Sequence, residues 1–206
     1  MTTESTPKIT NFADAFKYVN ERYLYTQKNY PLIAKLDGEN RKIFALNHGL
    51  LNILISAYKI GMDIPNEKSG INKLHWLTIP DEHLGKNSLE CKKAILEVFK
   101  YILSIANTAG ITEQQIRDFH VPDDESMMDL IHIKQMKNTI VPTFQDTLDY
   151  FIKKLATMLE KAYLEGYISS APLVSLVASV IMSMMYWFDA DWVSDLLNQI
   201  PSVMKN

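Results

Sequence analysis

Two pairs of residues in this 206-residue chain have a spacing that suits a divalent metal ion. Asp146 and Asp149 lie three positions apart on a predicted helix, so their carboxylates share one face and offer the oxygen ligands that Mg²⁺ prefers. Asp129 and His132 repeat that spacing, with Glu125 one turn earlier. Di-iron bundles and all-α nucleotide pyrophosphatases use such motifs in pairs on facing helices, and no second motif occurs here. A metal-dependent hydrolase is therefore an alternative hypothesis, and no metal or other cofactor is expected.

The segment 106–119 has the spacing of a helix-turn-helix. Ala106 is small enough for a second helix to approach, Gly110 suits the turn, and Ile116 is placed to anchor the second helix. The side chains that would face a DNA groove are Thr112, Gln114, Gln115 and Arg117, and the last three are expected to carry the recognition. Acidic residues surround this segment, whereas DNA affinity depends on basic residues that neutralise phosphates. A DNA-binding regulator is the second alternative, and nucleic acid is not the expected partner.

Methionine and aromatic residues gather near the C-terminus, and this cluster is the most positive functional signal. Met is flexible and suits surfaces that accommodate another protein, while Tyr and Trp commonly anchor interfaces. The same residue types also fill ordinary cores. The predicted partner-binding residues are Met182, Met184, Met185, Tyr186, Trp187 and Trp192, together with Trp76 in the 62–87 loop.

Apolar periodicity, capping residues and breakers predict an all-α fold. The predicted helices cover about 11–30, 40–60, 88–109, 112–119, 123–137, 143–165, 172–188 and 191–200. They form a single irregular bundle of seven or eight helices around the apolar 172–188 helix, within one domain over 10–206. Residues 1–9 are predicted to be a disordered tail, and 62–87 a long irregular loop or insertion. The wide apolar face predicted to bury the second helix comprises Ile43, Phe44, Leu46, Leu50, Leu51, Leu54 and Ala57.

The run 167–188 carries no charged residue and is long enough to cross a bilayer. Five serines dilute its hydrophobicity. Three of them, Ser175, Ser179 and Ser183, recur every four positions, so they form one small polar stripe on a helix. A stripe of this kind allows close helix packing in a soluble bundle as well as in a membrane. We expect a core helix, with a membrane segment as the alternative.

The composition is that of a globular protein, with a net charge of −3, 22 % charged residues and a single cysteine. It excludes a disulfide framework, a cysteine-rich zinc module and a highly basic nucleic-acid-binding chain. No secretory signal precedes the first helix, so we expect a cytoplasmic protein. The leading hypothesis is a non-enzymatic adaptor in a multiprotein assembly, of which a chaperone-like secretion adaptor is one instance. An oligomer is compatible with this hypothesis.

Overall fold

The computed structural model describes residues 9–23, 35–63, 88–130, 144–187 and 198, and over this part of the chain it contains seven α-helices and no β-strand. The all-α prediction is confirmed. The helices are α1 (Phe12–Tyr23), α2 (Gly38–Asp63), α4 (Ser88–Ala109), α5 (Glu113–Asp118), α6 (Asp124–Leu130), α7 (Phe144–Glu165) and α8 (Ser170–Trp187). The predicted 191–200 helix lies outside the described residues except for Asn198, as do 64–87 of the predicted loop and 1–8 of the predicted tail.

Side-chain caps start α1 and α5 at the predicted places. The Asn11 side chain accepts a hydrogen bond of 2.9 Å from the backbone N–H of Asp14 at the start of α1. Thr112 and Gln115 form a reciprocal capping box on α5. Each cap satisfies backbone N–H groups that have no partner within the first turn of a helix.

Two glycines end the helices that precede them. Gly110 follows α4 with φ of 87°, and Gly166 follows α7 with φ of 77°. Residues with a Cβ atom rarely adopt this left-handed conformation, so glycine is the usual residue just beyond a helix C-terminus. Both helix ends were predicted from these glycines.

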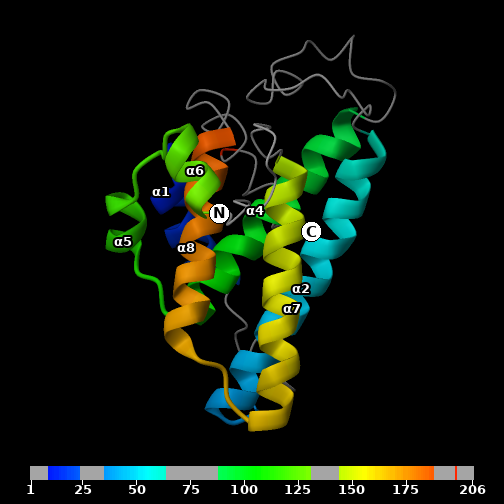
Figure 1. Cartoon of the computed structure of the whole chain (residues 1–206), viewed down its shortest axis with the longest axis vertical. Helices are drawn as coiled ribbons and strands as arrows, with labels where there is room; N and C mark the ends of the chain where they lie inside the picture. Colours follow the sequence, from blue (N-terminus) through cyan, green and yellow to red (C-terminus); the bar gives the residue numbers. More distant parts are fainter. Residues whose placement is uncertain (1–8, 24–34, 64–87, 131–143, 188–197, 199–206) are drawn as a thin grey trace, which may run out of the picture.

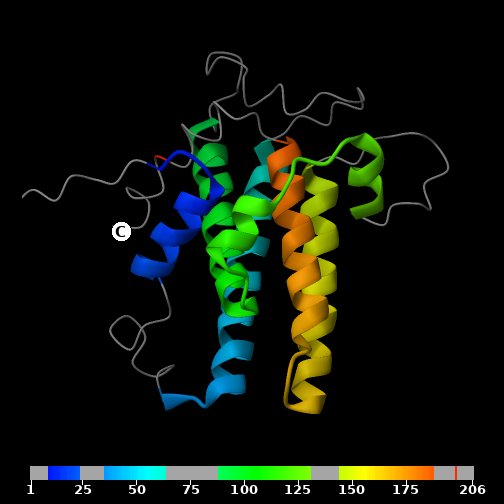
Figure 2. The same ribbon diagram turned by 90° about the vertical axis from the view of Figure 1, so that its left-hand side faces the viewer.

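Helix α4 lies at the centre of the described bundle, where α1, α2 and α8 pack around it (Figures 1 and 2). It is buried on almost its whole circumference from Ala94 to Ala106. The sequence prediction gave the central place to the apolar 172–188 helix. That segment forms α8, which is buried on one side and keeps Ser175 exposed on the other.

Helices α7 and α8 are joined by a short turn and lie side by side (Figure 2). Such a connection makes consecutive helices antiparallel neighbours. The buried side of α8 includes Leu173, Val177 and Val180. Among the described helices, α8 has the length and composition of a membrane span, a test that the core helix of a soluble protein also passes.

Helix α2 packs along α4 and α7, but its apolar residues do not all face the core. Ile43, Leu46 and Ala57 are buried as predicted. Phe44, Leu51 and Leu54, which were predicted to be core residues, are exposed, and that part of the prediction is wrong. The apolar residues of α2 surround the whole helix, whereas α4 and α7 cover only part of its circumference.

Ile9, which the sequence prediction assigned to the tail, is buried at 1 % exposure. Its backbone N–H donates a hydrogen bond of 3.0 Å to the side-chain oxygen of Asn198. This bond joins residues that are 189 positions apart in the chain.

Candidate docking surface

Three of the predicted partner-binding residues lie in the core at the end of α8. Met184, Tyr186 and Trp187 are buried. The Trp187 indole N–H donates a hydrogen bond of 3.2 Å to the Thr147 hydroxyl of α7, and the Tyr186 hydroxyl donates one of 2.5 Å to Asp124 of α6. These bonds satisfy the polar atoms of two large buried side chains. Their partner-binding role stays a prediction, and the contacts seen here are those of core residues.

Desolvation by burial, reinforced by the Asp124 carboxylate, raises the pKa of Tyr186 to about 12. The tyrosine therefore stays protonated at neutral pH and acts as a donor that ties α8 to α6.

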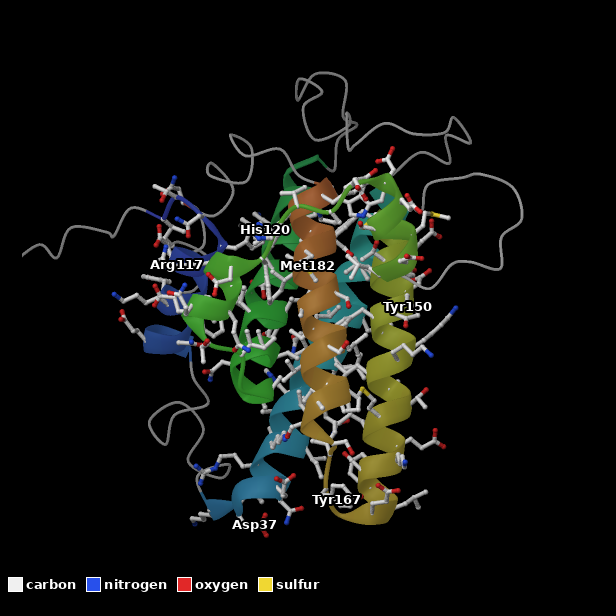
Figure 3. All side chains as sticks on the ribbon, turned by 60° about the vertical axis from the view of Figure 1, so that its left-hand side comes forward. Asp37, Arg117, His120, Tyr150, Tyr167 and Met182 are labelled. Atoms are coloured by element: carbon white, nitrogen blue, oxygen red, sulfur yellow. The ribbon has the colours of Figure 1, made fainter. Side chains whose placement is uncertain are left out.

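The other predicted partner-binding residues are less enclosed or lie elsewhere. Met182 and Met185 are half-buried on α8, where Figure 3 labels Met182. Trp76 and Trp192 lie outside the described residues. Burial therefore divides the predicted methionine and aromatic cluster into enclosed residues and partly exposed ones. Met182 and Met185 are the members that solvent reaches in part.

The candidate metal ligands do not form a site among the described residues. Asp146 and Asp149 are exposed on α7, Asp129 is exposed on α6, and His132 lies outside the described residues. Within the described ranges, no three His, Cys, Asp or Glu side chains come together as a metal site requires. The metal-dependent hydrolase stays an alternative prediction without a described site.

A cavity between α6, α7 and α8 is too small for a substrate. It is lined by Leu130, Thr147, Tyr150, Phe151, Leu176, Ser179, Val180 and Ser183. Its volume of about 10 Å³ admits at most one water molecule. Ser179 and Ser183 of the α8 stripe therefore line a closely packed contact with α7, whereas Ser175 is exposed.

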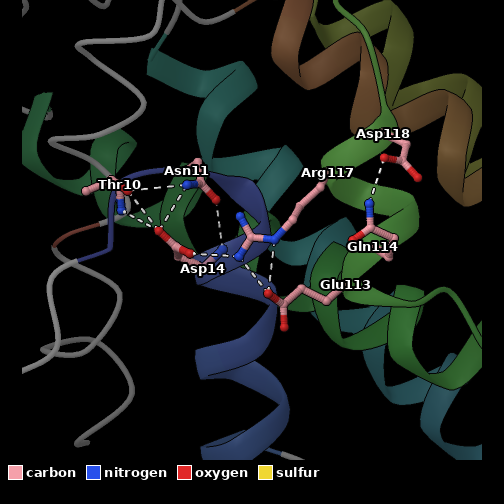
Figure 4. A network of polar contacts seen from close by, with 7 residues as sticks. All are labelled: Thr10, Asn11, Asp14, Glu113, Gln114, Arg117 and Asp118. Carbon is pink, nitrogen blue, oxygen red and sulfur yellow. Dashed lines mark hydrogen bonds and ion pairs between the residues drawn. The ribbon is translucent and has the colours of Figure 1, made fainter.

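The predicted helix-turn-helix segment forms a corner in which polar side chains bind one another (Figure 4). The Arg117 guanidinium donates to Glu113 at 2.6 Å and to Asp14 of α1 at 3.3 Å. The Gln114 side chain donates to Asp118 at 2.8 Å. Because Thr112 and Gln115 form the capping box, the side chains predicted to read DNA are all engaged within the protein, and α5 has only six residues. These observations favour a structural corner.

Burial alone would raise the pKa of Asp14, but hydrogen bonds from Thr10 and Arg117 outweigh it, and its pKa lies below the ordinary value. The carboxylate is therefore charged at neutral pH and holds α5 against α1.

The outer face of α2 carries five of the nine large hydrophobic side chains that are exposed among the described residues. Its large apolar side chains keep much of their surface in solvent: Phe44 44 %, Leu51 56 %, Leu54 49 %, Ile55 47 % and Tyr58 69 %. Together with His48, which lies between Phe44 and Leu51 on the same side, we call these residues the α2 seam. Because a side chain of this size presents roughly 200 Å² when fully exposed, the five apolar residues expose on the order of 500 Å². A patch of that size is at the upper end for a monomeric protein and is often functional.

The spacing of the α2 seam is that of a helix that packs against another helix. Phe44, His48, Leu51, Ile55 and Tyr58 follow one another by four, three, four and three positions. This 3.5-residue repeat keeps the side chains on one narrow stripe and is the repeat of coiled coils. The seam therefore has the form of one half of a helix–helix contact.

Charge is absent along the α2 seam, and its polar flanks are already hydrogen-bonded. No Asp, Glu, Lys or Arg occurs from Ile43 to Tyr58. The Asn47 amide donates to the Ile43 carbonyl at 2.9 Å and to the Tyr163 hydroxyl at 2.8 Å, and the Asn52 amide donates to the His48 carbonyl at 2.7 Å. Covering polar groups that have partners costs far less than covering unsatisfied ones.

His48 joins the α2 seam to α4. Its ring stacks on Phe44 at 6.5 Å and meets the edge of Tyr101 at 5.7 Å, measured between ring centroids. Burial lowers the pKa of His48, and the nearby Lys100 ammonium lowers it further. Lys100 is itself buried and forms an ion pair with Glu97. The imidazole is therefore neutral at pH 7, and the seam carries no net charge there.

Sequence reasoning missed the α2 seam because it assigned Phe44, Leu51 and Leu54 to the buried face of α2. The signal was present, since the uncharged stretch from Ile43 to Tyr58 places apolar side chains on all sides of the helix. Whether such a helix is enclosed depends on how many other helices pack around it. The sequence of the helix itself does not contain this information.

Comparisons with known proteins do not assign the chain to a family. No family model matches it, and neither a curated protein nor a solved structure matches it. The α2 seam is consequently the feature on which a function can best be based.

Proposed function

We propose that the protein is a non-enzymatic α-helical component of a multiprotein assembly and that it docks an apolar helix along the α2 seam. The observation that carries this proposal is the exposure of an uncharged apolar stripe about four turns long with 3.5-residue spacing. Recognition of a helix through apolar side chains at such spacings is a common mode of protein–protein binding.

A helix suits the α2 seam better than an extended peptide does. Extended peptides are typically held by pairing their backbone with the open edge of a sheet, whereas the backbone groups within a helix are already paired. The seam instead offers rows of side chains between which the side chains of a second helix can insert.

The α2 seam is rigid before any partner binds, because the opposite face of α2 is packed on α4. At Gly49 the two helices approach so closely that an added Cβ would lie 2.8 Å from Ile105. A surface that is already in its binding geometry loses little conformational entropy on association. Leu51, at the middle of the seam, is the expected centre of the binding energy.

Site-specific photo-crosslinking in cells that naturally contain the protein tests this proposal. A photoreactive residue replaces Leu51, and the same residue at Leu164, which is 86 % exposed at the end of α7, is the matched control. We expect a discrete protein adduct from position 51 and none from position 164. Equal labelling at both positions, or no adduct at position 51, would refute the proposal. A third position, Met182, tests the predicted contact on α8 in the same experiment.

A further inference from the structure

We infer that the helix docked on the α2 seam is α2 of a second copy of this chain, packed antiparallel around a two-fold axis at Leu51. This inference rests on the proposed function and names its partner. The assembly would then be built on a homodimer.

The α2 seam is symmetric about Leu51, as a two-fold interface requires. In an antiparallel pair Leu51 meets its own copy, and Phe44, seven positions before, meets Tyr58, seven positions after. His48 then lies beside Leu54 and Ile55 of the other copy. Aromatic residues thus pair at both ends, and aliphatic residues fill the middle. Aromatic pairs of this kind add to the stabilisation that area burial gives.

The charge distribution permits two identical faces to meet. Two identical surfaces carry the same charges, so like charges would repel each other across a self-contact. Such a contact requires that the surface be uncharged or that the two-fold symmetry place the charges far apart. The α2 seam carries none, and the nearest cations in the sequence are Lys42 before it and Lys59 after it, with Arg41 one position beyond Lys42. A parallel pair would place each of these positions beside its own copy, whereas an antiparallel pair about Leu51 places position 59 opposite position 43 of the other copy, close to positions 42 and 41. Cationic positions therefore neighbour each other at the ends of the seam in either orientation, and antiparallel packing is favoured because it opposes the two helix dipoles.

The exposed area is sufficient for a specific dimer. The five apolar side chains of the two copies together present roughly 1,000 Å². A specific interface needs about that much total buried area, and His48, Asn47 and Asn52 add to it. Both asparagine side chains donate hydrogen bonds within the monomer, so each amide nitrogen keeps a partner when the face is covered.

Sedimentation velocity of the purified full chain over a range of concentrations tests the dimer. We expect a dimer in the wild type, because the α2 seam is the interface, and a monomer for Leu51→Glu, which places two carboxylates at the two-fold axis. Loss of an anchor at the centre of an interface weakens binding by roughly 100-fold or more. Leu164→Glu, the matched control, should remain a dimer. Circular dichroism and thermal unfolding verify that both variants fold.

Cysteine crosslinking tests the antiparallel orientation independently. In a Cys91→Ser background, which removes the single native cysteine, Leu51→Cys should form a disulfide with its own copy. Phe44→Cys should not, because the two copies of position 44 lie about 21 Å apart. A mixture of Phe44→Cys and Tyr58→Cys chains should crosslink. Crosslinking of Phe44→Cys with itself would contradict the antiparallel arrangement.

The two proposals fail in different ways. A wild type that is monomeric at every concentration overturns the dimer, and a photo-adduct of position 51 with a different protein then leaves the proposed function standing. A dimer that persists in Leu51→Glu overturns the assignment of the α2 seam as its interface. A monomer with no adduct at position 51 overturns both proposals.

Discussion

Replacing Gly49 with alanine perturbs a close approach of α2 to α4. The added Cβ would lie 2.8 Å from both Cγ1 and Cδ1 of Ile105. Ordinary contacts between carbon atoms are about 3.5 to 4.0 Å, so the overlap approaches 1 Å. Ile105 is 1 % exposed and has little room to move away. The variant must therefore shift the Ile105 side chain or separate the two helices.

Two opposing effects set the size of the change in stability. Overpacking a core typically costs about 1 to 3 kcal/mol. Alanine is favoured over glycine within a helix by about 1 kcal/mol. We therefore expect Gly49→Ala to lower the free energy of unfolding by about 1 kcal/mol, which corresponds to a decrease in Tm of about 2 to 4 °C for a domain of this size.

Denaturant unfolding of Gly49→Ala, Ile105→Ala and the double variant, at one fixed protein concentration, measures this effect. Ile105→Ala alone should cost about 2 to 5 kcal/mol because it leaves a cavity. It also removes both atoms that clash with the new methyl group. The double variant should therefore be more stable than the sum of the single effects by about 1 to 2 kcal/mol. Gly38→Ala is the matched control in the same helix, since nothing lies within 4 Å of its added Cβ.

Additive free energies in the double variant would refute the proposed clash at Ile105. A Gly49→Ala protein at least as stable as Gly38→Ala would do the same. Either result would mean that α2 and α4 are less closely packed at this position and that the α2 seam is held less rigidly.

Three further predictions concern His48, Trp187 and Gly110. The free energy of unfolding should decrease as the pH falls below about 6.5, because burial and Lys100 lower the pKa of His48 and the unfolded chain therefore binds the proton first. When stability is measured from pH 7.5 to 5, the His48→Gln variant should show a smaller decrease. Trp187→Ala should lower the free energy of unfolding by about 3 to 5 kcal/mol in denaturant titration, since it removes a buried ring and the hydrogen bond of that ring to Thr147. An unchanged midpoint would contradict the place of Trp187 in the core. Gly110→Ala should cost about 1 to 2 kcal/mol by thermal unfolding because its φ of 87° is unfavourable for alanine, although space is open around it.

The starts and ends of helices could be predicted from the sequence because their causes are local. Asn11 and Thr112 each accept a hydrogen bond from a backbone N–H three residues on, and Gly110 and Gly166 adopt the conformation that only glycine readily takes. These interactions span fewer than six residues, so the order of residues along the chain is sufficient to identify them.

The tertiary structure alone decided which apolar surface remains exposed. Helices α2 and α8 both contain long uncharged stretches, and the sequence predicted core positions at Leu51 of α2 and an interface at Trp187 of α8. In the structure Trp187 is covered, with Thr147 of α7 as its hydrogen-bond partner, whereas no described helix covers Leu51. Burial depends on neighbours far away in the sequence, such as Thr147 forty positions before Trp187. The periodicity of a single helix specifies its faces but not which of them another helix will cover.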